Sequence, residues 1–303
     1  MVYHTPVMLD EVIDNLIEDP NGIYVDLTFG GGGHSKEIIK RLNKGHLYAF
    51  DQDKDVVQNL KDFEQYDNFT FINSNGKHIK QFLEYYDVKR INGVFLDLGI
   101  SSYQIDTPER GFSTRFLGDL DMRMNKNANL TAQIVVNEYS ASRLQKIFKE
   151  YGELENSSLI VETIVDYRKK KQITTTNDLK EILLKNVKMN TRYQAKFLSK
   201  VFQAIRIEVN DELNTLKDIL TSVRDILTRN DRIVVISYHS LEDRIVKNFF
   251  KCGNFNGVVD KDFYGNITTP FKPLYKKPIT PSINEIISNN RSRSARLRVG
   301  IKL

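Results

Sequence analysis

Cysteine is almost absent from this sequence, in which Cys252 is the only thiol. A single cysteine excludes an intrachain disulfide and a zinc site built on cysteines. The histidines form neither an H-x-x-H nor an H-E-x-x-H pattern, so we expect no metal site. Apolar runs near the roughly 18 residues that span a bilayer are missing too. The N-terminal segment also lacks the basic and apolar regions of a signal peptide, and we expect a cytoplasmic protein.

The sequence also has only a small excess of basic over acidic residues. The 44 basic residues are offset by 39 acidic ones, which leaves a net charge of +5 and a pI of about 9.0. This balance permits a nucleic-acid partner but does not require one. With 303 residues, of which 40% are hydrophobic, the chain can bury a full core and is long enough for two domains.

Short apolar segments alternate with helical patterns in the first hundred residues. The expected strands are 23–27, 47–51, 69–72 and 94–98, and the expected helices lie near 34–43, 54–64 and 77–86. Such alternation is typical of parallel strands joined by right-handed crossovers. The sequence therefore predicts an α/β fold with a doubly wound, Rossmann-like sheet.

The alternation stops after about Ile105, and helical patterns with polar loops continue to about Phe202. A stretch without proline or glycine runs from Ala195 to Thr228 and carries apolar residues at helical spacing. A helical domain inserted into the α/β domain explains this change. The expected domains are 1–105 (first part of the α/β domain), 106–202 (inserted helical domain) and 203–303 (second part).

The remaining C-terminal elements resume the α/β pattern. The expected elements are a strand at 232–237, a helix at 241–250 and a last strand at 297–303, whereas 253–277 has the character of a loop. Two local basic clusters, 168–171 and 291–298, could bind phosphates, but charge runs are commonly solvated faces, and the second could simply protect an edge strand.

Four consecutive glycines, Gly30 to Gly33, follow the first expected strand directly and precede a helix. Glycines let the backbone approach a ligand closely, and the helix N-terminus presents unpaired amides. Asp51 ends the next strand, where a carboxylate commonly accepts hydrogen bonds from ribose hydroxyls. The pattern indicates a nucleoside site that would suit NAD or S-adenosylmethionine equally; a tight turn without a ligand is the structural alternative.

Asp97 stands at the carboxyl end of the fourth strand and is followed by Ser101, Ser102 and Gln104. Open α/β sheets place reacting groups at this edge, and a carboxylate there can accept a hydrogen bond from an exocyclic amine such as cytosine N4. The alternative is that these side chains only cap a turn.

The segment 237–244, SYHSLEDR, follows the strand at 232–237. A Ser-His-Asp hydrolase is not supported, because the G-x-S-x-G elbow is absent and the residues are too close in sequence. Ser240 with Asp243 instead indicates a helix N-terminus. His239 could face a substrate or serve the structure, and the sequence leaves both open.

These segments together resemble the bacterial 16S ribosomal RNA cytosine-N4 methyltransferases, the MraW-type family, almost from end to end. The matching blocks are HTPVMLDEV at 4–12, DLTFGGGGHS at 26–35, AFDQD at 49–53, FLDLGISS at 95–102, ERGFS at 109–113, LDMRM at 120–124, FQAIRIEVNDEL at 202–213, VISYHSLEDRIVK at 235–247 and NRSRSARLRV at 290–299.

The resemblance implies a class I S-adenosylmethionine-dependent methyltransferase fold whose inserted helical domain engages RNA. It implies S-adenosyl-L-methionine as cofactor and a cytidine at the decoding centre of 16S ribosomal RNA, free or in the small subunit, as target. The family's cofactor contacts fall on Gly32, Gly33, His34, Asp51, Gly76, Asp97 and Gln104. Gly76 departs from the family, which usually has an aromatic residue beside the adenine, so a side-chain contact is lost there.

The expected reaction moves the sulfonium methyl group in line onto an exocyclic amine, and the protein mainly orients and desolvates the reactants. Asp97 and the loop with Ser101 are the candidate catalytic groups, with His239 as a further wall or proton route. Cytosine C5 chemistry would need a thiolate at a strand end, and Cys252 lies beyond the helix 241–250. The alternatives are a DNA amino-methyltransferase, whose Pro-Pro-Tyr or Pro-Pro-Phe motif is absent, a nicotinamide-dependent dehydrogenase and a non-enzymatic nucleic-acid-binding regulator.

Overall fold

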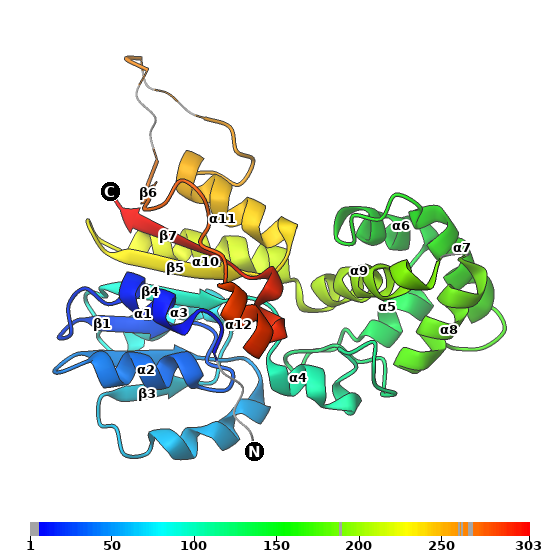
Figure 1. Ribbon diagram of the computed structural model, residues 1–303, viewed down its shortest axis with the longest axis horizontal. Coiled ribbons are helices and arrows are strands. Elements are labelled where there is room, and N and C mark those ends of the chain that lie inside the picture. The colour runs from blue at the N-terminus through cyan, green and yellow to red at the C-terminus, as the bar shows by residue number, and fades with distance from the viewer. Residues whose placement is uncertain (1–5, 188–189, 260, 262, 266–268) are drawn as a thin grey trace. The chain divides into compact units, whose positions relative to one another are not determined.

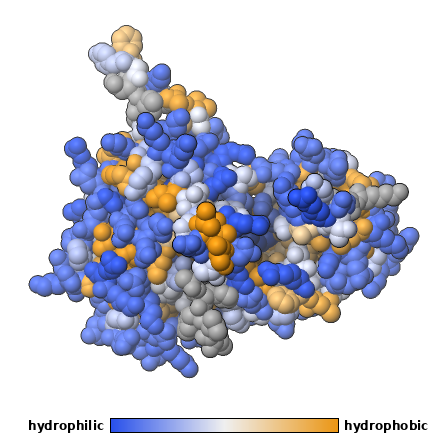
Figure 2. Space-filling model, in the orientation of Figure 1, coloured by the Kyte–Doolittle hydropathy of each residue, from blue (hydrophilic) through white to orange (hydrophobic). Residues whose placement is uncertain are grey.

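The computed structural model describes residues 6–187, 190–259, 261, 263–265 and 269–303. The chain forms two compact units, the first made of residues 1–99 and 213–303 and the second of residues 100–212. His4 and Thr5 of the first family block lie outside the described residues. No helix in the described part of the chain is long and apolar enough to cross a membrane. Hydrophilic side chains cover most of the visible surface (Figure 2).

The first unit contains a seven-stranded sheet in the order β3-β2-β1-β4-β5-β7-β6 (Figure 1). The strands are β1 Ile23–Asp26, β2 His46–Phe50, β3 Phe69–Ile72, β4 Gly93–Asp97, β5 Arg232–Ser237, β6 Phe271–Pro273 and β7 Arg296–Lys302. The first five are parallel, and β7 runs antiparallel to both β5 and β6. This is the doubly wound sheet that the sequence predicts. The chain adds strands in one direction from β1 to β3 and in the other from β4 to β5, so the switch point lies between β1 and β4.

Helices cover both faces of this sheet because its strands alternate between two apolar clusters. Val94 and Leu96 of β4 belong to one cluster, and Phe95 belongs to the other. The first cluster includes α3 Ile79–Tyr85, α10 Glu212–Ile226 and α11 Ser240–Cys252; the second includes α1 Leu9–Leu16, α2 Gly33–Arg41 and the 3₁₀ helix η1 Lys54–Phe63. Both faces are therefore closed to water, as parallel sheets require.

The predicted elements agree with the observed ones to within one or two residues at most ends, and the differences are local. The segment expected as a helix at 54–64 is a 3₁₀ helix. The segment 253–277, expected as a loop, contains the edge strand β6. It is followed by α12 Ile283–Ser288 and η4 Asn290–Ser294. β7 lies between β5 and β6, so the arginines of 291–298 do not protect an edge strand.

The second unit is helical and has its own core. Its elements are α4 Ser102–Asp106, η3 Pro108–Arg110, α5 Ala132–Glu138, α6 Ala141–Glu150, α7 Ser157–Arg168, α8 Thr176–Asn186 and α9 Thr191–Asn210. The predicted limits of 106 and 202 are too narrow at both ends. Ile100 packs against this core, and α9 continues past residue 202 with Ile205 and Val209 buried in the same cluster.

The long helical pattern at 195–228 contains one break. Asp211 adopts the left-handed conformation, with φ 49° and ψ 41°, and separates α9 from α10. Its amide caps α9 by donating to the Glu208 carbonyl. Arg206 and Glu212 form an ion pair across the break at 2.8 Å. The apolar spacing continues through both helices, so the pattern alone does not reveal this end.

Candidate active site

The glycine turn connects β1 to α2 at the carboxyl edge of the sheet. Gly30 and Gly32 have φ values of 51° and 76°, which favour glycine. A Cβ atom on Gly32 would lie 2.8 Å from the Phe63 ring, whereas one on Gly31 would meet no heavy atom of the described chain within 4 Å. The turn is therefore closely packed on one side and leaves room for a ligand on the other.

The amides of the first turn of α2 are also available to a ligand. The helix begins after Gly32 without a side-chain cap in the described part of the chain. Uncapped amides at a helix N-terminus favour an anion such as a carboxylate. The combination of open space at Gly31 and these amides fits a nucleoside cofactor that carries a carboxylate.

Asp51 directly follows β2 and is bonded to the same turn. Its Oδ2 accepts a hydrogen bond of 2.8 Å from the Gly30 amide, and its Oδ1 accepts one of 2.8 Å from the Asp53 amide. Burial raises the pKa of Asp51 to about 6, and these hydrogen bonds act in the opposite direction. Carboxylate oxygens have further lone pairs, so the side chain can also accept hydrogen bonds from ribose hydroxyls.

A buried carboxyl beneath the turn connects β1, α2 and β4. Asp26 Oδ2 accepts a hydrogen bond of 2.6 Å from Ser35 Oγ, and its Oδ1 accepts one of 2.9 Å from the Thr28 amide. Thr28 Oγ1 in turn accepts one of 2.6 Å from the Asp97 amide. Burial raises the pKa of Asp26. This network fixes the end of β4 relative to the glycine turn.

Asp97 ends β4, and its carboxyl lies between two side chains. Oδ1 accepts a hydrogen bond of 2.8 Å from Tyr238 Oη, and Oδ2 lies 3.8 Å from His34 Nδ1. Burial raises the pKa of Asp97 to about 7, nearby Glu242 adds to the rise, and the Tyr238 hydrogen bond opposes it. Both protonation states are therefore populated near neutral pH, which is the range a proton acceptor needs.

The His34 ring has a structural role, because it is hydrogen-bonded to the N-terminal segment before α1. Nε2 lies 2.9 Å from the Val7 carbonyl oxygen and donates to it, since a carbonyl can only accept. Burial lowers the pKa of His34, so the neutral ring presents the Nδ1 lone pair toward Asp97. Among the predicted cofactor residues, His34 can therefore contribute its backbone amide at the start of α2.

Gly76 begins the 3₁₀ helix η2 Gly76–His78 and is buried. A Cβ there would lie 3.2 Å from Leu27 Cβ and 3.4 Å from Ile219 Cδ1. This position therefore has little room for the aromatic residue that the family usually carries. Beside it, Asn75 Nδ2 donates to Gln52 Oε1 at 2.8 Å, which places Gly76 near the residue that follows Asp51.

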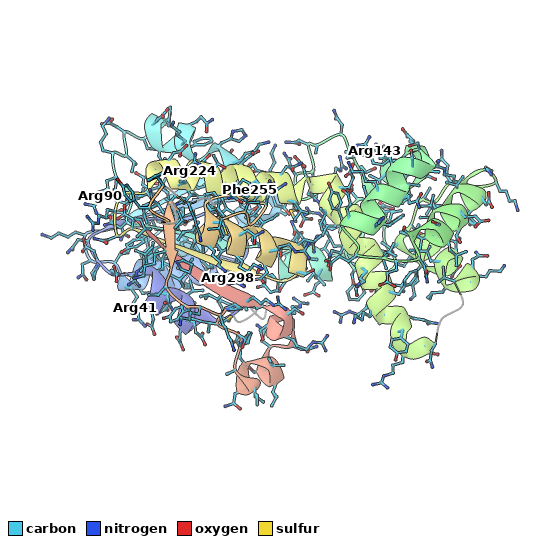
Figure 3. The ribbon with its side chains drawn as sticks, turned by 90° about the horizontal axis from the view of Figure 1, so that it is seen from above. Arg41, Arg90, Arg143, Arg224, Phe255 and Arg298 are labelled. Atoms are coloured by element: carbon cyan, nitrogen blue, oxygen red, sulfur yellow. The ribbon has the colours of Figure 1, made fainter. Side chains whose placement is uncertain are left out.

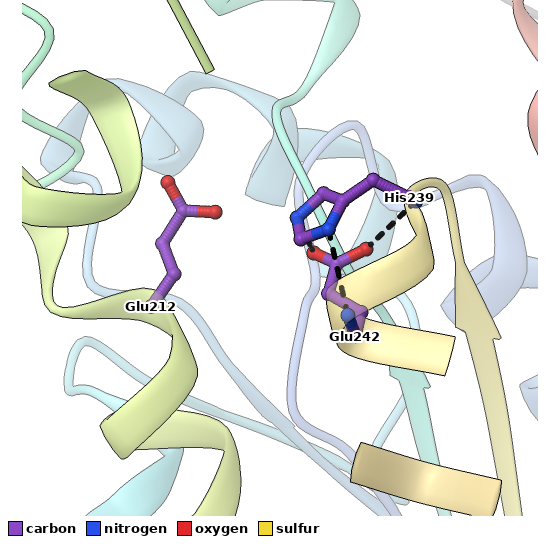
Figure 4. A group of neighbouring side chains, drawn as sticks. All are labelled: Glu212, His239 and Glu242. Atoms are coloured by element: carbon purple, nitrogen blue, oxygen red, sulfur yellow. Dashed lines mark hydrogen bonds and ion pairs between the residues drawn. The ribbon is translucent and has the colours of Figure 1, made fainter. Parts of the chain in front are cut away.

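His239 caps α11, the role that the sequence assigned to Ser240. Its Nδ1 accepts from the Glu242 amide at 3.4 Å, and the Glu242 carboxylate accepts from the His239 amide (Figure 4). The same carboxylate also accepts from the Tyr238 amide. His239 Nε2 is buried and lies 3.2 Å from Glu242 Oε1, but it makes no hydrogen bond of normal geometry in the described part of the chain. The capping partner is therefore Glu242 rather than Asp243, whose carboxylate pairs with Arg296 and Arg298.

Ser101 and Gln104 belong to the second unit, where they form a reciprocal capping box. Ser101 Oγ accepts from the Gln104 amide at 3.2 Å, and Gln104 Oε1 accepts from the Ser101 amide at 3.1 Å. The turn-capping alternative thus accounts for the positions of both side chains.

Tyr238 is the site residue that the sequence reasoning missed. β4 and β5 are parallel neighbours with Asp97 opposite Ile236, so residues just after the two strands meet at one edge. The signal was present in the polar residue that follows the apolar strand RIVVIS, directly before His239.

The chain is similar to known proteins over its whole length. A model of the MraW methylase family matches residues 1–303. The protein named "Ribosomal RNA small subunit methyltransferase H" of Amoebophilus asiaticus is 51% identical over 298 residues, covering 98% of this chain and 95% of the relative. Those of the same name in Flavobacterium johnsoniae and Phocaeicola vulgatus are 50% and 49% identical, and they cover 100% and 99% of this chain and 99% and 98% of each relative.

These findings confirm the predicted resemblance, the methyltransferase class and S-adenosylmethionine as the cofactor. The sheet order with an antiparallel β7 agrees with the predicted class I methyltransferase fold. Matched from the first residue to the last, the chain belongs to the MraW methylase family.

Proposed function

We propose that this protein transfers the methyl group of S-adenosylmethionine to N4 of a cytidine in 16S ribosomal RNA, at the decoding centre. The observation that carries the proposal is the Asp97 carboxyl, with its pKa raised to about 7, on the same sheet edge as the glycine turn. The names of the relatives favour ribosomal RNA over DNA or a nicotinamide substrate.

The residues that would hold the cofactor are those of the glycine turn and Asp51. The amides of Gly32, Gly33 and His34 suit its carboxylate, and Asp51 suits its ribose. The backbone of Gly76 adds a close wall, and Gln104 is a further candidate contact. When bound, the cofactor supplies a methyl group on an activated sulfonium.

Asp97 would act on the target base. In its ionised form the carboxylate accepts a hydrogen bond from the exocyclic amine, favours the geometry in which the nitrogen attacks, and can take the proton. Tyr238 holds the carboxyl by donating to Oδ1, which leaves Oδ2 for the amine. His239 would form a further wall, and Ser101 could donate its hydroxyl proton from the loop after β4. The base must leave its stack to reach this edge.

The second unit and the basic tail would contact the RNA. Arg168 Nη1 donates to the Val136 carbonyl, and Lys169 pairs with Asp166, so this cluster is partly engaged within its own unit. Arg296 and Arg298 share Asp243. We expect any phosphate contacts of these clusters to make RNA affinity fall with salt.

The deciding experiment is mass spectrometry of nucleosides from ribosomal RNA of cells with and without this gene, followed by reaction of the purified protein with that RNA. N4-methylcytidine that disappears with the gene and is restored by the protein supports the proposal. Its presence in both RNA samples, or a different methylated nucleoside, contradicts it.

The cofactor assignment is tested separately with Asp51→Ala, and with Asp67→Ala on an exposed carboxylate as control. Calorimetry should show a loss of S-adenosylmethionine affinity of roughly 1–3 kcal/mol for Asp51→Ala alone. Equal affinities for both variants and the unmodified protein would remove Asp51 from the site.

A further inference from the structure

A basic cavity of about 370 Å³ lies on the first unit, lined by residues of α11, β7 and the segment around β6. Five of its lining residues are cationic: Lys247, Lys251, Lys276, Lys277 and Arg298. No acidic residue lines it in the described part of the chain. Its size falls in the range of small-ligand sites, which is roughly 300–1,000 Å³.

The lysines supply the net charge of this lysine-rich cavity. Lys247 and Lys251 are four residues apart on α11 and so lie on one face of the helix. Arg298, labelled beside β7 in Figure 3, is engaged by Asp243, because its Nε lies 2.6 Å from Asp243 Oδ1. The four lysines form no ion pair within the described residues, and four lining charges of one sign favour an anion.

Tyr275 adds an aromatic surface that is fixed in place. Its hydroxyl donates a hydrogen bond of 2.9 Å to Asn15 Oδ1, while 43% of the residue remains exposed. An anchored, exposed ring beside lysines is the combination with which proteins bind single-stranded nucleic acid, because bases stack on the ring and phosphates pair with the cations. A free phosphate would use the charge but not the ring.

Helix α11 leads from the candidate active site to the cavity. Tyr275 lies toward the opposite edge of the sheet, because the carbonyl of its partner Asn15 accepts from Arg232 at the start of β5. α11 begins at Ser240, directly after Tyr238 and His239. Lys247 stands seven residues along this helix, which corresponds to roughly 10 Å from its start. An RNA strand whose target base reaches Asp97 can therefore continue along α11 on the same unit.

We propose that the lysine-rich cavity binds a nucleotide of single-stranded RNA that flanks the target cytidine, with its phosphate at Lys247 and Lys251 and its base against Tyr275. The inference rests on the proposed function, because that function makes RNA the substrate. It adds an RNA contact on α11 and around β6 to those proposed for the inserted unit and for the arginine tail of the α/β unit.

The test measures binding of a short unstructured RNA to the full chain by fluorescence anisotropy at several salt concentrations, without cofactor. Lys247→Ala with Lys251→Ala should reduce the slope of log affinity against log salt by about 1.4, which is roughly 25-fold in affinity at 0.1 M salt. Tyr275→Ala should lower affinity roughly 5- to 150-fold with the slope unchanged, whereas Tyr275→Phe keeps the ring and should bind nearly normally.

The matched control is Lys40→Ala with Arg41→Ala at the C-terminal end of α2, where both side chains are 53% exposed. A slope for the Lys247 and Lys251 variant equal to that of this control would overturn the inference. Binding of a free mononucleotide that is lost in Tyr275→Ala, together with RNA affinity that is the same for this variant and the unmodified protein, would also overturn it in favour of a mononucleotide site. Because no methyl transfer is measured, lost RNA affinity in these variants supports the inference even if N4-methylcytidine is never formed.

Discussion

Tyr238 donates a hydrogen bond of 2.8 Å to Asp97 across the ends of two neighbouring parallel strands. Burial beside Asp97 raises the pKa of Tyr238 well above its ordinary value, so the phenol stays protonated and remains a donor. The bond favours the ionised form of Asp97 and limits the rise of the pKa that burial causes.

Tyr238→Phe should therefore raise the pKa of Asp97. The rate of methyl transfer increases with pH as Asp97 ionises, and this increase should move to higher pH in the variant. A hydrogen bond to a charged group contributes roughly 1.5–3 kcal/mol, so the shift should be about one pH unit or somewhat more. Initial rates from pH 6 to 9 test this, with the strongest loss at low pH and recovery at high pH. Tyr85→Phe, at a residue that is 79% exposed, serves as control. A uniform loss at every pH would indicate that Tyr238 only supports the fold.

Asp97→Asn should abolish most methyl transfer and yet stabilise the protein in a pH-dependent way. The folded pKa of about 7 is above the ordinary 3.8, so the folded state holds a proton that the unfolded state has lost between these values. Stability from this group is therefore present at low pH and lost as pH rises toward and through 7. The melting temperature of the variant minus that of the unmodified protein should be larger at pH 8 than at pH 5. The exposed Asp67→Asn control should show no such trend, and a difference independent of pH would contradict the assignment.

Gly31→Ala and Gly32→Ala form a matched pair within the glycine turn. Gly31→Ala places a methyl group in open space, so the melting temperature should be unchanged while cofactor affinity falls. Gly32→Ala combines a positive φ with a clash against Phe63. The left-handed conformation alone costs a non-glycine residue roughly 1–2 kcal/mol, so the variant should be destabilised by at least that amount. Calorimetry and thermal unfolding of both variants separate the two effects. Normal cofactor affinity in Gly31→Ala would mean that the open side of the turn is not the binding side.

Arg298→Ala should destabilise the first unit, in contrast to Arg293→Ala on the exposed part of the tail. Arg298 is 13% exposed in its side chain and binds both oxygens of Asp243, whose pKa it lowers. Removal leaves a buried acceptor poorly satisfied, at a cost of roughly 1–3 kcal/mol. Denaturant unfolding at pH 7 measures this loss, which should shrink as Asp243 becomes protonated in acid. Equal stability of the two variants would contradict a structural role for Arg298.

The fold was predictable from sequence where a single physical signal decides it. The parallel strands are continuous apolar runs bounded by polar residues, and their ends were predicted to within about one residue. The break between α9 and α10 at Asp211 was not predicted, because apolar spacing continues on both sides and no glycine marks the left-handed residue. β6 has only three residues, too few to show a pattern.

The candidate site was predictable as a location but not as a set of contacts. The glycine turn, Asp51 and Asp97 follow from strand ends that share one edge. Sequence could not show that the His34 ring turns to the Val7 carbonyl, or that the Tyr238 hydroxyl reaches Asp97. The first contact depends on the direction of a ring at the start of α2, and the second on side chains that follow two strands which the second unit separates in sequence.

That separation has a consequence for biosynthesis. β4 and β5 are adjacent in the sheet, but the whole second unit is translated between them. At about 5–20 residues per second, the ribosome needs on the order of ten seconds between completing β4 and presenting β5. Throughout that interval the backbone edge of β4 has no β5 to pair with, and Phe95 and Leu96 on its two faces lack the packing that β5 supplies. The contiguous second unit can complete its core before β5 is made, whereas the sheet of the first unit can close only afterwards.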